Sequence, residues 1–531
     1  MLDVIIIGSG GAGLSAALSA KDLTNKVLII SKTYPTHSQT VQAQGGINCV
    51  LDEENDSIEN HINDTYNSSK YISNKNTIKT MCKNAKETIQ WLDKLGVPFS
   101  KDEKGNIKQR YFGGTKNKRT CYSSDYTGLK IIHTLYDNCI KNDIKFLHEH
   151  ILIDLIIEDN KYKGVKIYDL ENGKIKNIYS KSLIIATGGY GNVYSKHTTN
   201  SISTTGDGLA IAYRNGIKLS NLEFIQFHPT ALKGTNTLIS ESARAEGAYL
   251  VDKNEKRFVD ELSTRDEVAR AIKEKLLKDE DVYLDMRHIN IDILKEKMPQ
   301  EIRLIKDILN IDVSKDLIPI TPAVHYTMGG ILVDVSCETS IKNIYACGEV
   351  AQNNTHGANR LGGNSLLEII TFGKIAGKEA ANKSKQIVEN RAKEIEDDIQ
   401  FIKELLTKEI NKSIYEIKNE LSTYMFKNTG LFRTKNDLIK MLDIIKILEK
   451  EYKNSGIKNK DLNYNKNLLE YLEIGNIILL SKLTVISALK REESRGSHYR
   501  IDFKNSSEKY KKISTMQLIN GEDKHNFEDA I

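Results

Sequence analysis

Residues 4–30 constrain the fold of this chain more than any other segment. Apolar residues 4–7 predict a buried parallel strand, residues 14–18 predict the start of a helix, and residues 27–30 predict a second strand. Three glycines lie between the first strand and the helix: Gly8, Gly10 and Gly13. They suit a tight turn, a close approach of the backbone to a pyrophosphate, and the packing of the helix on the strand. Because the glycines lie between a strand and a helix, the segment predicts a β–α–β unit that binds a nucleotide.

The second predicted strand lacks the acidic residue that binds ribose in NAD-binding units. It ends with Ile30, Ser31 and Lys32, which disfavours NAD as the cofactor. Two later segments, residues 183–189 and 344–349, again run from an apolar strand into a glycine turn. Three strand–glycine segments spread over about 350 residues predict one nucleotide-binding domain that an insertion interrupts.

The composition excludes several classes of protein. A chain of 531 residues is too long for one core, so we expect about two to four domains. Its 76 basic and 71 acidic residues are mixed along the sequence, which predicts no nucleic-acid partner. The six cysteines form no CxxC pair, so we expect reduced thiols, no metal or iron–sulfur site, and no thiol–disulfide flavoenzyme chemistry. No stretch approaches the roughly 20 apolar residues of a membrane span, which predicts no direct membrane insertion.

A series of motifs extends along the chain in collinear order, and together they are more specific than any one alone. They are PTHSQTV (35–41), AQGGI (43–47), KRTCY (118–122), IHTLY (132–136), TGDG (205–208), QFHPT (226–230), YLDMRH (283–288), HYTMGG (325–330), HGANRL (356–361) and ESRGSH (493–498). Through these motifs the chain resembles the flavoprotein subunits of succinate dehydrogenases and fumarate reductases. The resemblance covers residues 1–503.

The resemblance implies an α/β fold in which a Rossmann-like FAD-binding domain is split by an α+β capping domain and followed by a C-terminal helical domain. The implied boundaries are residues 1–222 and 331–385 for the FAD-binding domain, 223–330 for the capping domain, 386–503 for the helical domain, and 504–531 for a polar tail without assigned structure. Apolar residues at spacings of three and four support the helical part: Ile395, Ile399, Ile402 and Leu406, then Leu468 and Leu472.

The resemblance also implies FAD as the cofactor. The residues that match the family's FAD contacts are Gly8, Gly10, Gly13, Ser31, Lys32, Thr40, Gly45, Gly46, Asp207, Glu349 and Ser365. The residues that match the clamp for the two carboxylates of fumarate or succinate are His228, Ser240, His325 and Arg360. Arg265 matches the family's proton donor, and Glu241 and Arg244 match the relay that returns the proton to it. Glu241 and Arg244 share a face if that stretch is helical.

The chemistry of fumarate reduction explains why these residue types occur together. A dianion needs cationic and hydrogen-bonding groups, and the planar guanidinium of arginine fits a carboxylate best. Charge that develops on the substrate needs fixed donors in a site closed to water. An arginine with a pKa above about 12 serves as an acid when the acceptor is a transient carbanion-like centre and a nearby carboxylate reprotonates it. Each residue alone has a simpler interpretation, such as a surface ion pair, and their collinear order is what favours the site.

Gln39 departs from the family pattern. Members that belong to membrane complexes carry there a histidine bonded covalently to the flavin, and an amide nitrogen is too weak a nucleophile for that bond. We therefore expect non-covalent FAD, with His37 as the alternative attachment residue, because residues two apart in an extended segment face the same side. Loss of the covalent bond should lower the flavin potential, which favours fumarate reduction over succinate oxidation. Ser240 stands where the family usually has threonine, and it keeps the hydroxyl.

Two other functions remain open. L-aspartate oxidase shares the architecture, the clamp and non-covalent FAD, and both Gln39 and the chain length suit it. Met328 and residues 119–122 and 472–476 instead favour the succinate and fumarate branch. A non-catalytic FAD-binding or assembly protein would not need a proton donor such as Arg265.

The chain carries no ligands for an iron–sulfur cluster or haem, so electrons must reach it from elsewhere. The resemblance implies an iron–sulfur subunit and a membrane quinone module as partners. It also implies a cytoplasmic location, with peripheral attachment to the cytoplasmic face of the inner membrane through these partners.

Overall fold

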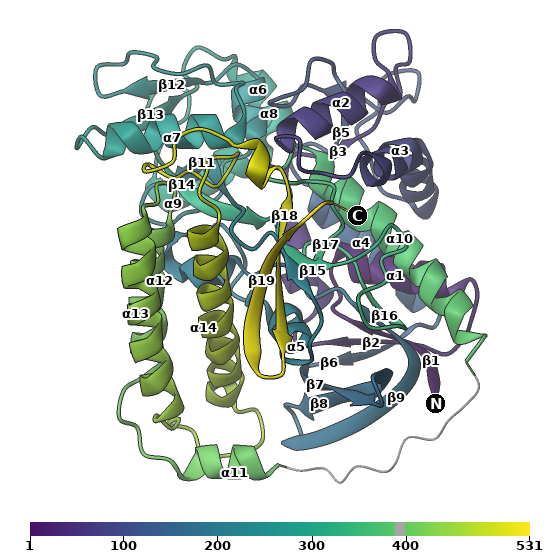
Figure 1. Ribbon diagram of the computed structural model, residues 1–531. Coiled ribbons are helices and arrows are strands. Elements are labelled where there is room, and N and C mark those ends of the chain that lie inside the picture. Colours follow the sequence, from purple (N-terminus) through teal and green to yellow (C-terminus); the bar gives the residue numbers. More distant parts are fainter. Residues whose placement is uncertain (388–398, 531) are drawn as a thin grey trace.

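Figure 1 shows the computed structural model of the protein, which describes residues 1–387 and 399–530. Its largest sheet has seven strands, and five of them run parallel to one another. These five are β6 (Lys145–His148), β2 (Val27–Ser31), β1 (Leu2–Ile7), β9 (Lys174–Ile185) and β16 (Ile344–Ala346). The three strand–glycine segments therefore meet in one sheet, which confirms the predicted α/β fold with an interrupted nucleotide-binding domain.

The parallel strands are apolar because both faces of the sheet are covered. Val4 and Ile6 belong to one buried cluster, whereas Ile5 and Ile7 belong to another on the opposite face. The first face packs against helices, and Figure 1 shows α1 and α10 side by side along it. The helices near this face are α1 (Gly11–Lys21), α2 (Ile58–Ser68), α3 (Lys75–Leu95), α4 (Thr127–Lys141) and α10 (Asn364–Ser384).

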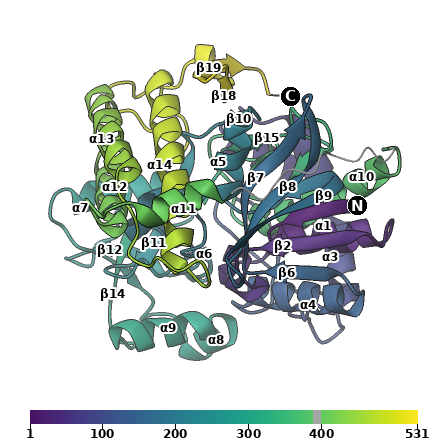
Figure 2. The same cartoon turned by 90° about the horizontal axis from the view of Figure 1, so that it is seen from below.

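Antiparallel strands extend the large sheet beyond β9. The strand β7 (His150–Glu158) pairs with β8 (Lys161–Asp169), which pairs with the first half of β9. Figure 2 shows this meander from below, beside the parallel strands. Helix α5 (Asp207–Arg214) contacts β7. A small sheet joins β3 (Ile47–Asn48), β5 (Thr120–Cys121) and β4 (Gln109–Arg110) beside α10.

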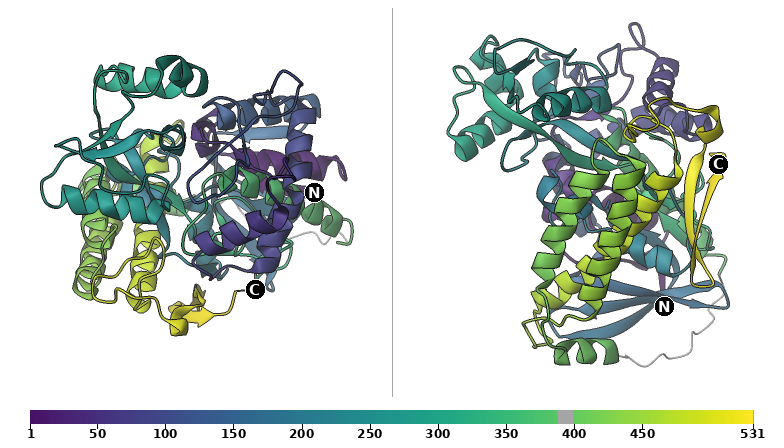
Figure 3. Two further views of the ribbon diagram at one scale, coloured as in Figure 1. Left: turned by 90° about the horizontal axis from the view of Figure 1, so that it is seen from above. Right: turned by 60° about the vertical axis from the view of Figure 1, so that its left-hand side comes forward.

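A second, antiparallel sheet with its own core lies within the predicted capping segment. Its strands are, in order, β11 (Ile225–Leu232), β14 (Ile318–Thr327), β13 (Val282–Asp285) and β12 (Tyr249–Asp252). Its helices are α6 (Glu241–Ala245), α7 (Arg265–Leu276), α8 (Ile291–Lys297) and α9 (Pro299–Leu309). Buried apolar residues from these elements form a separate cluster. Figure 3 shows from above that this part lies beside the first helices of the chain.

The C-terminal part is mainly helical. Its helices are α11 (Gln400–Thr407), α12 (Ile414–Thr429), α13 (Lys435–Lys453) and α14 (Lys466–Lys490), and the last three pack side by side (Figure 3). Ile402 and Leu406 lie in α11, and Leu468 and Leu472 lie in α14, as their spacing predicts. Ile395 lies outside the described residues.

The prediction that no stretch is long and apolar enough for a membrane span is wrong for α14. The helix is long and apolar enough to cross a membrane, since a window of 18 residues within it has a mean hydropathy of 1.6. However, 67% of this window is buried inside the protein. The helix packs against α5, α12 and α13. Its apolar character therefore follows from its position, because two thirds of this window lies in the core of the protein.

The predicted polar tail contains secondary structure in its described part, residues 504–530. The strands β18 (Ile513–Ile519) and β19 (Glu522–Glu528) form a hairpin, and β18 pairs with β10 (Leu219–Ser220). They complete a five-stranded sheet with β15 (Gly330–Leu332) and β17 (Ala351–Gln352). Ile513 and Met516 are buried there. The sequence did not reveal this hairpin because β19 is half charged and because β10, the other partner of β18, lies almost 300 residues earlier.

Candidate active site

A cavity that is partly open to solvent extends from the glycine turn after β1 to the second sheet, with about 1550 Å³ of empty space when its open mouth is included. Residues from both ends of the predicted site line it. From the predicted FAD contacts these are Gly8, Gly10, Ser31, Lys32, Thr40, Gly45, Gly46, Asp207, Glu349 and Ser365. From the predicted substrate and proton-transfer residues these are His228, Ser240, Glu241, Arg265, His325 and Arg360. Gly13 and Arg244 lie behind the lining.

The glycine turn has the geometry that the sequence predicts. Gly8 has a φ of +111°, and a β-carbon there would lie 2.3 Å from the carbonyl oxygen of Ala186. A β-carbon on Gly13 would lie 2.0 Å from the carbonyl oxygen of Gly8, so this glycine is required where helix and strand pack together. The N-cap of α1, Gly10, supplies no side-chain hydrogen bond, and the first turn of the helix has no acidic residue. A helix N-terminus of this kind that faces a cavity fits a pyrophosphate.

A buried ion cluster occupies the end of β2. The Lys32 Nζ lies 2.7 Å from Asp207 Oδ2, 2.6 Å from Glu473 Oε1 and 2.7 Å from Thr205 Oγ1. Asn476 donates to the other oxygen of Asp207 at 2.8 Å. Although burial opposes it, the charges of Asp207 and Glu473 raise the pKa of Lys32. The lysine that stands in place of the usual ribose-binding acid is therefore charged and joins α5 and α14 to the nucleotide end of the cavity.

Gln39 and His37 differ in their position relative to the cavity. Gln39 lines it, and its Oε1 accepts a hydrogen bond of 2.6 Å from the backbone N–H of Ser201. His37 is exposed and lies outside the lining. Glu349 lies deeper, where its Oε1 accepts hydrogen bonds from the backbone and hydroxyl of Thr327 at 2.9 and 3.0 Å. Burial raises the pKa of Glu349 to about 7.

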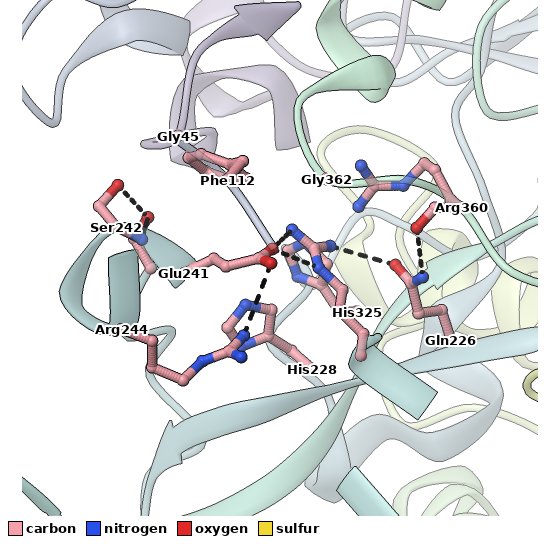
Figure 4. Close-up of polar contacts among 12 residues, drawn as sticks. Gly45, Phe112, Gln226, His228, Glu241, Ser242, Arg244, His325, Arg360 and Gly362 are labelled. Atoms are coloured by element: carbon pink, nitrogen blue, oxygen red, sulfur yellow. Dashed lines mark hydrogen bonds and ion pairs between the residues drawn. The ribbon is translucent and has the colours of Figure 1, made fainter. Parts of the chain in front are cut away.

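The predicted proton donor and its relay are in contact. Figure 4 shows the Glu241 carboxylate between two guanidinium groups. Its Oε2 accepts from Arg265 Nε at 2.7 Å and lies 2.6 Å from the terminal nitrogen Nη2, while its Oε1 lies 3.9 Å from Arg244. All three side chains are buried. Residues 241–245 are helical, so Glu241 and Arg244 share a face as predicted.

The four predicted clamp residues surround the same end of the cavity. His228 on β11 and His325 on β14 have ring centroids 5.1 Å apart. Ser240 caps α6, and its hydroxyl contacts that of Ser242 at 2.9 Å. The guanidinium of Arg360 lies over the Tyr326 ring, 4.3 Å from the centroid.

The clamp carries excess positive charge. Burial, reinforced by Arg265, lowers the pKa of His228 and His325 well below 6.5, so both rings are neutral at pH 7. The same two causes lower the pKa of Arg360 to about 10, which leaves it charged. Its buried Nε has no partner among the described residues. Three buried arginines, Arg244, Arg265 and Arg360, thus stand near one ion-paired carboxylate, that of Glu241, and they fit an anionic ligand because an unpaired buried cation is costly.

Comparison with known proteins agrees with this geometry. A family model described as an FAD binding domain matches residues 3–366, and one described as the fumarate reductase flavoprotein C-term matches residues 418–529. The chain belongs to the family of succinate dehydrogenase and fumarate reductase flavoprotein subunits. It is therefore an FAD-dependent oxidoreductase of this family, and FAD is its cofactor.

Relatives within the flavoprotein family span nearly the whole chain. The succinate dehydrogenase flavoprotein subunit of Rickettsia bellii is 35% identical, over 96% of this chain and 91% of its own length. The 8-methylmenaquinol:fumarate reductase flavoprotein subunit of Wolinella succinogenes is 37% identical, over 94% and 86%. A solved structure of an Escherichia coli quinol fumarate reductase flavoprotein variant has a TM-score of 0.95 and 31% identity, covering 100% of this chain and 96% of that one.

The structure of this family member adds residues that were not assigned roles from the sequence. Gln226 accepts from Arg265 at 3.1 Å and donates to the backbone oxygen of Arg360 at 2.9 Å, so it joins the donor to the clamp (Figure 4). Gln226 could have been assigned a role from the sequence, because it is the first residue of the QFHPT motif. Phe112 and Leu238 also line the cavity, and single apolar residues carry no such signal. Glu473 belongs to residues 472–476, which were noted only as a mark of the branch.

Proposed function

We propose that the protein is the flavoprotein subunit of a fumarate reductase or succinate dehydrogenase, which interconverts fumarate and succinate. The contact that supports this most is the Glu241 carboxylate held between Arg265 and Arg244 beside the clamp. A protein that only binds FAD has no use for a buried acid between two arginines. When bound, FAD supplies the hydride acceptor and donor.

The side chains divide the remaining work. Arg360, His325, His228 and Ser240 hold the two substrate carboxylates, because they offer charged and neutral donors around one end of the cavity. Arg265 delivers a proton to the substrate carbon, and Glu241 reprotonates it over the contact of 2.7 Å. Arg244 resupplies Glu241, and its buried Nε has no partner among the described residues. Because both histidines are neutral, the positive charge that faces the dianion comes from Arg360 and Arg265.

We expect the glycine turn, Thr40, Lys32 with Asp207, Glu349 and Ser365 to hold FAD non-covalently, because Gln39 supplies no nucleophile. Thr40 Oγ1 accepts from the N–H of Gly11 at 3.1 Å, which fixes the segment beside the pyrophosphate site. The lower flavin potential that follows favours fumarate reduction. Equal rates of fumarate reduction by a reduced dye and succinate oxidation by an oxidised dye would contradict this direction.

L-aspartate oxidase is the second candidate, and the observation in its favour is Gln39 in the cavity lining. Incubation with L-aspartate under air decides between the two functions. Flavin bleaching with release of peroxide supports the oxidase, whereas fumarate reduction without a response to L-aspartate supports the reductase.

We propose an iron–sulfur subunit and a membrane quinone module as the partners, because relatives are named as subunits and one takes 8-methylmenaquinol in its name. The protein would then lie at the cytoplasmic face of the inner membrane. Purification from the native source with and without detergent, followed by a visible spectrum, tests both points. A complex that contains iron–sulfur and haem absorbance only with detergent is the expected result.

A further inference from the structure

A buried acid outside the proton relay, Glu301, contacts the segment that carries the relay. It is the third residue of α9, is 2% exposed, and its Oε1 accepts a hydrogen bond from the backbone N–H of Ser240. Ser240 is the N-cap of α6, and α6 begins with Glu241 and includes Arg244. Glu301 therefore holds the point at which the backbone enters the relay helix.

The N-terminus of α9 is in turn held from the FAD-binding part. Its own N-cap, Met298, supplies no side-chain hydrogen bond. Asp125, in the loop before α4, accepts from the backbone N–H of Glu301 at 2.9 Å and is fully buried. A carboxylate at a helix N-terminus is favoured by the helix dipole and by the free N–H groups there. The cap of this helix thus comes from a segment far away in sequence, across the contact between the two parts.

Arg110 connects the start of α9 to the segment that carries Gly45 and Gly46, two of the predicted FAD contacts. Its guanidinium donates to the carbonyl oxygens of Gln44, Gly45 and Ser124 at 3.1, 2.5 and 3.2 Å. One terminal nitrogen of Arg110, Oδ1 of Asp125 and Oε2 of Glu301 are buried and have no partner among the described residues. Burial, reinforced by Asp125 and opposed by Arg110, raises the pKa of Glu301 to about 8. At neutral pH this carboxyl is thus protonated and still accepts from Ser240.

We propose that Asp125 and Glu301 form a latch that fixes the relay helix α6 in its working position only while the second sheet is docked on the FAD-binding part. Glu301 is a positioning residue, since it contacts the Ser240 backbone and not the cavity. Undocking removes the cap from α9, which frees Glu301 and with it the start of α6. The second sheet can therefore dock on the FAD-binding part only together with the alignment of the proton relay. This inference rests on the proposed function for its kinetic consequence.

The test compares Glu301→Ala, Glu301→Gln and the control Glu296→Ala. Glutamine keeps the shape and the acceptor of a protonated glutamate. Glu296 lies near the same contact, but its side chain is 72% exposed and only approaches Lys108 at 4.0 Å. We expect Glu301→Ala with full FAD content to lose about tenfold in kcat for fumarate reduction, with KM changed less than threefold and a larger solvent deuterium isotope effect on kcat. Glutamine should recover most of the loss, and Glu296→Ala should stay within twofold.

A second readout does not depend on the reaction. Hydrogen exchange of the amides of residues 240–245 should be faster in Glu301→Ala and in Asp125→Ala than in Glu296→Ala. The double variant Asp125→Ala/Glu301→Ala should lose no more kcat than the worse single variant, because both remove one linkage. Additive losses, or a Glu301→Ala protein with full FAD, unchanged kcat and unchanged exchange, would overturn the latch. Wild-type protein that does not reduce fumarate would instead overturn the proposed function, and exchange at α6 would still decide the latch.

Discussion

Arg265 Nε lies 2.7 Å from Glu241 Oε2, and both side chains are buried at the junction of the second sheet and the cavity. Burial of either charged group without the other would cost several kcal/mol of folding free energy, so each group requires the other. The pair brings the start of α7 to the start of α6 and aims both at the clamp.

The first prediction concerns Arg265. Replacement by lysine keeps a positive charge but loses the fork that contacts both Glu241 and Gln226. We expect kcat for fumarate reduction to fall about a thousandfold, within the range of general acid catalysis, while FAD content stays unchanged. Steady-state kinetics with a reduced dye measure the loss. Arg303→Lys, on the exposed face of α9, is the control and should keep its activity, and an Arg265→Lys enzyme within tenfold of wild type would remove Arg265 from its role.

The second prediction concerns the attachment of FAD. Because Gln39 replaces the attachment residue and His37 lies outside the cavity lining, acid precipitation should release the flavin into the supernatant. Absorbance at the flavin band in pellet and supernatant measures the release. His37→Ala should not change the result. Yellow colour that stays with the wild-type pellet and leaves it in His37→Ala would show that His37 carries the flavin.

The third prediction concerns the ion cluster at the end of β2. Lys32→Met leaves Asp207 and Glu473 buried without their cation, so we expect the free energy of unfolding to fall by about 3 kcal/mol and FAD to bind at least tenfold more weakly. Urea unfolding and flavin titration measure the two effects. Lys26→Met, at an exposed position near the same strand, is the matched control. Equal stability of the two variants would mean that the cluster contributes nothing.

The fourth prediction concerns pH. Burial, reinforced by Glu349, raises the pKa of Glu368 on α10 to about 8. The pKa of this acid is about 4.3 in the unfolded chain and higher in the folded protein. Below about pH 4.3 the acid is protonated in both states and does not lower the stability. Between about pH 4.3 and 8 the unfolded chain loses the proton more readily, so the free energy of unfolding falls as the pH rises. We therefore expect the melting temperature of wild type, relative to Glu368→Gln, to decrease between pH 5 and pH 8. Glu379→Gln on the same helix should follow the wild type, and parallel curves for all three proteins would refute the shift.

Local signals in the sequence predicted the strands and glycine turns around the nucleotide, because each depends on neighbouring residues. Gly13 is required by a contact with Gly8 in its own β–α–β unit, whereas the residue that a β-carbon on Gly8 would meet, Ala186, lies far away in the sequence. Residues that act across the fold carried no such signal. Gln226 could have been assigned from its motif, whereas Asp125 as the cap of α9 depends on a contact over 176 positions. The sequence of α14 did not show that the helix is buried in the core, because its packing partners α5, α12 and α13 are known only from the structure.

The hairpin of β18 and β19 must be synthesised before the structure around β10 can be completed. β18 pairs with β10, and β10 lies directly before β11, the first strand of the second sheet along the chain. Arg491 and Ser514 also bind the buried carboxylate of Glu223 at that junction, at 2.6 and 2.7 Å. A nascent chain that has emerged only through residue 500 would hold its nucleotide-binding strands but leave β10 with an open edge and Glu223 without Ser514. Because domains fold as they leave the ribosome, residue 519 must emerge from the ribosome before this junction closes, and until then β10 keeps an unpaired edge.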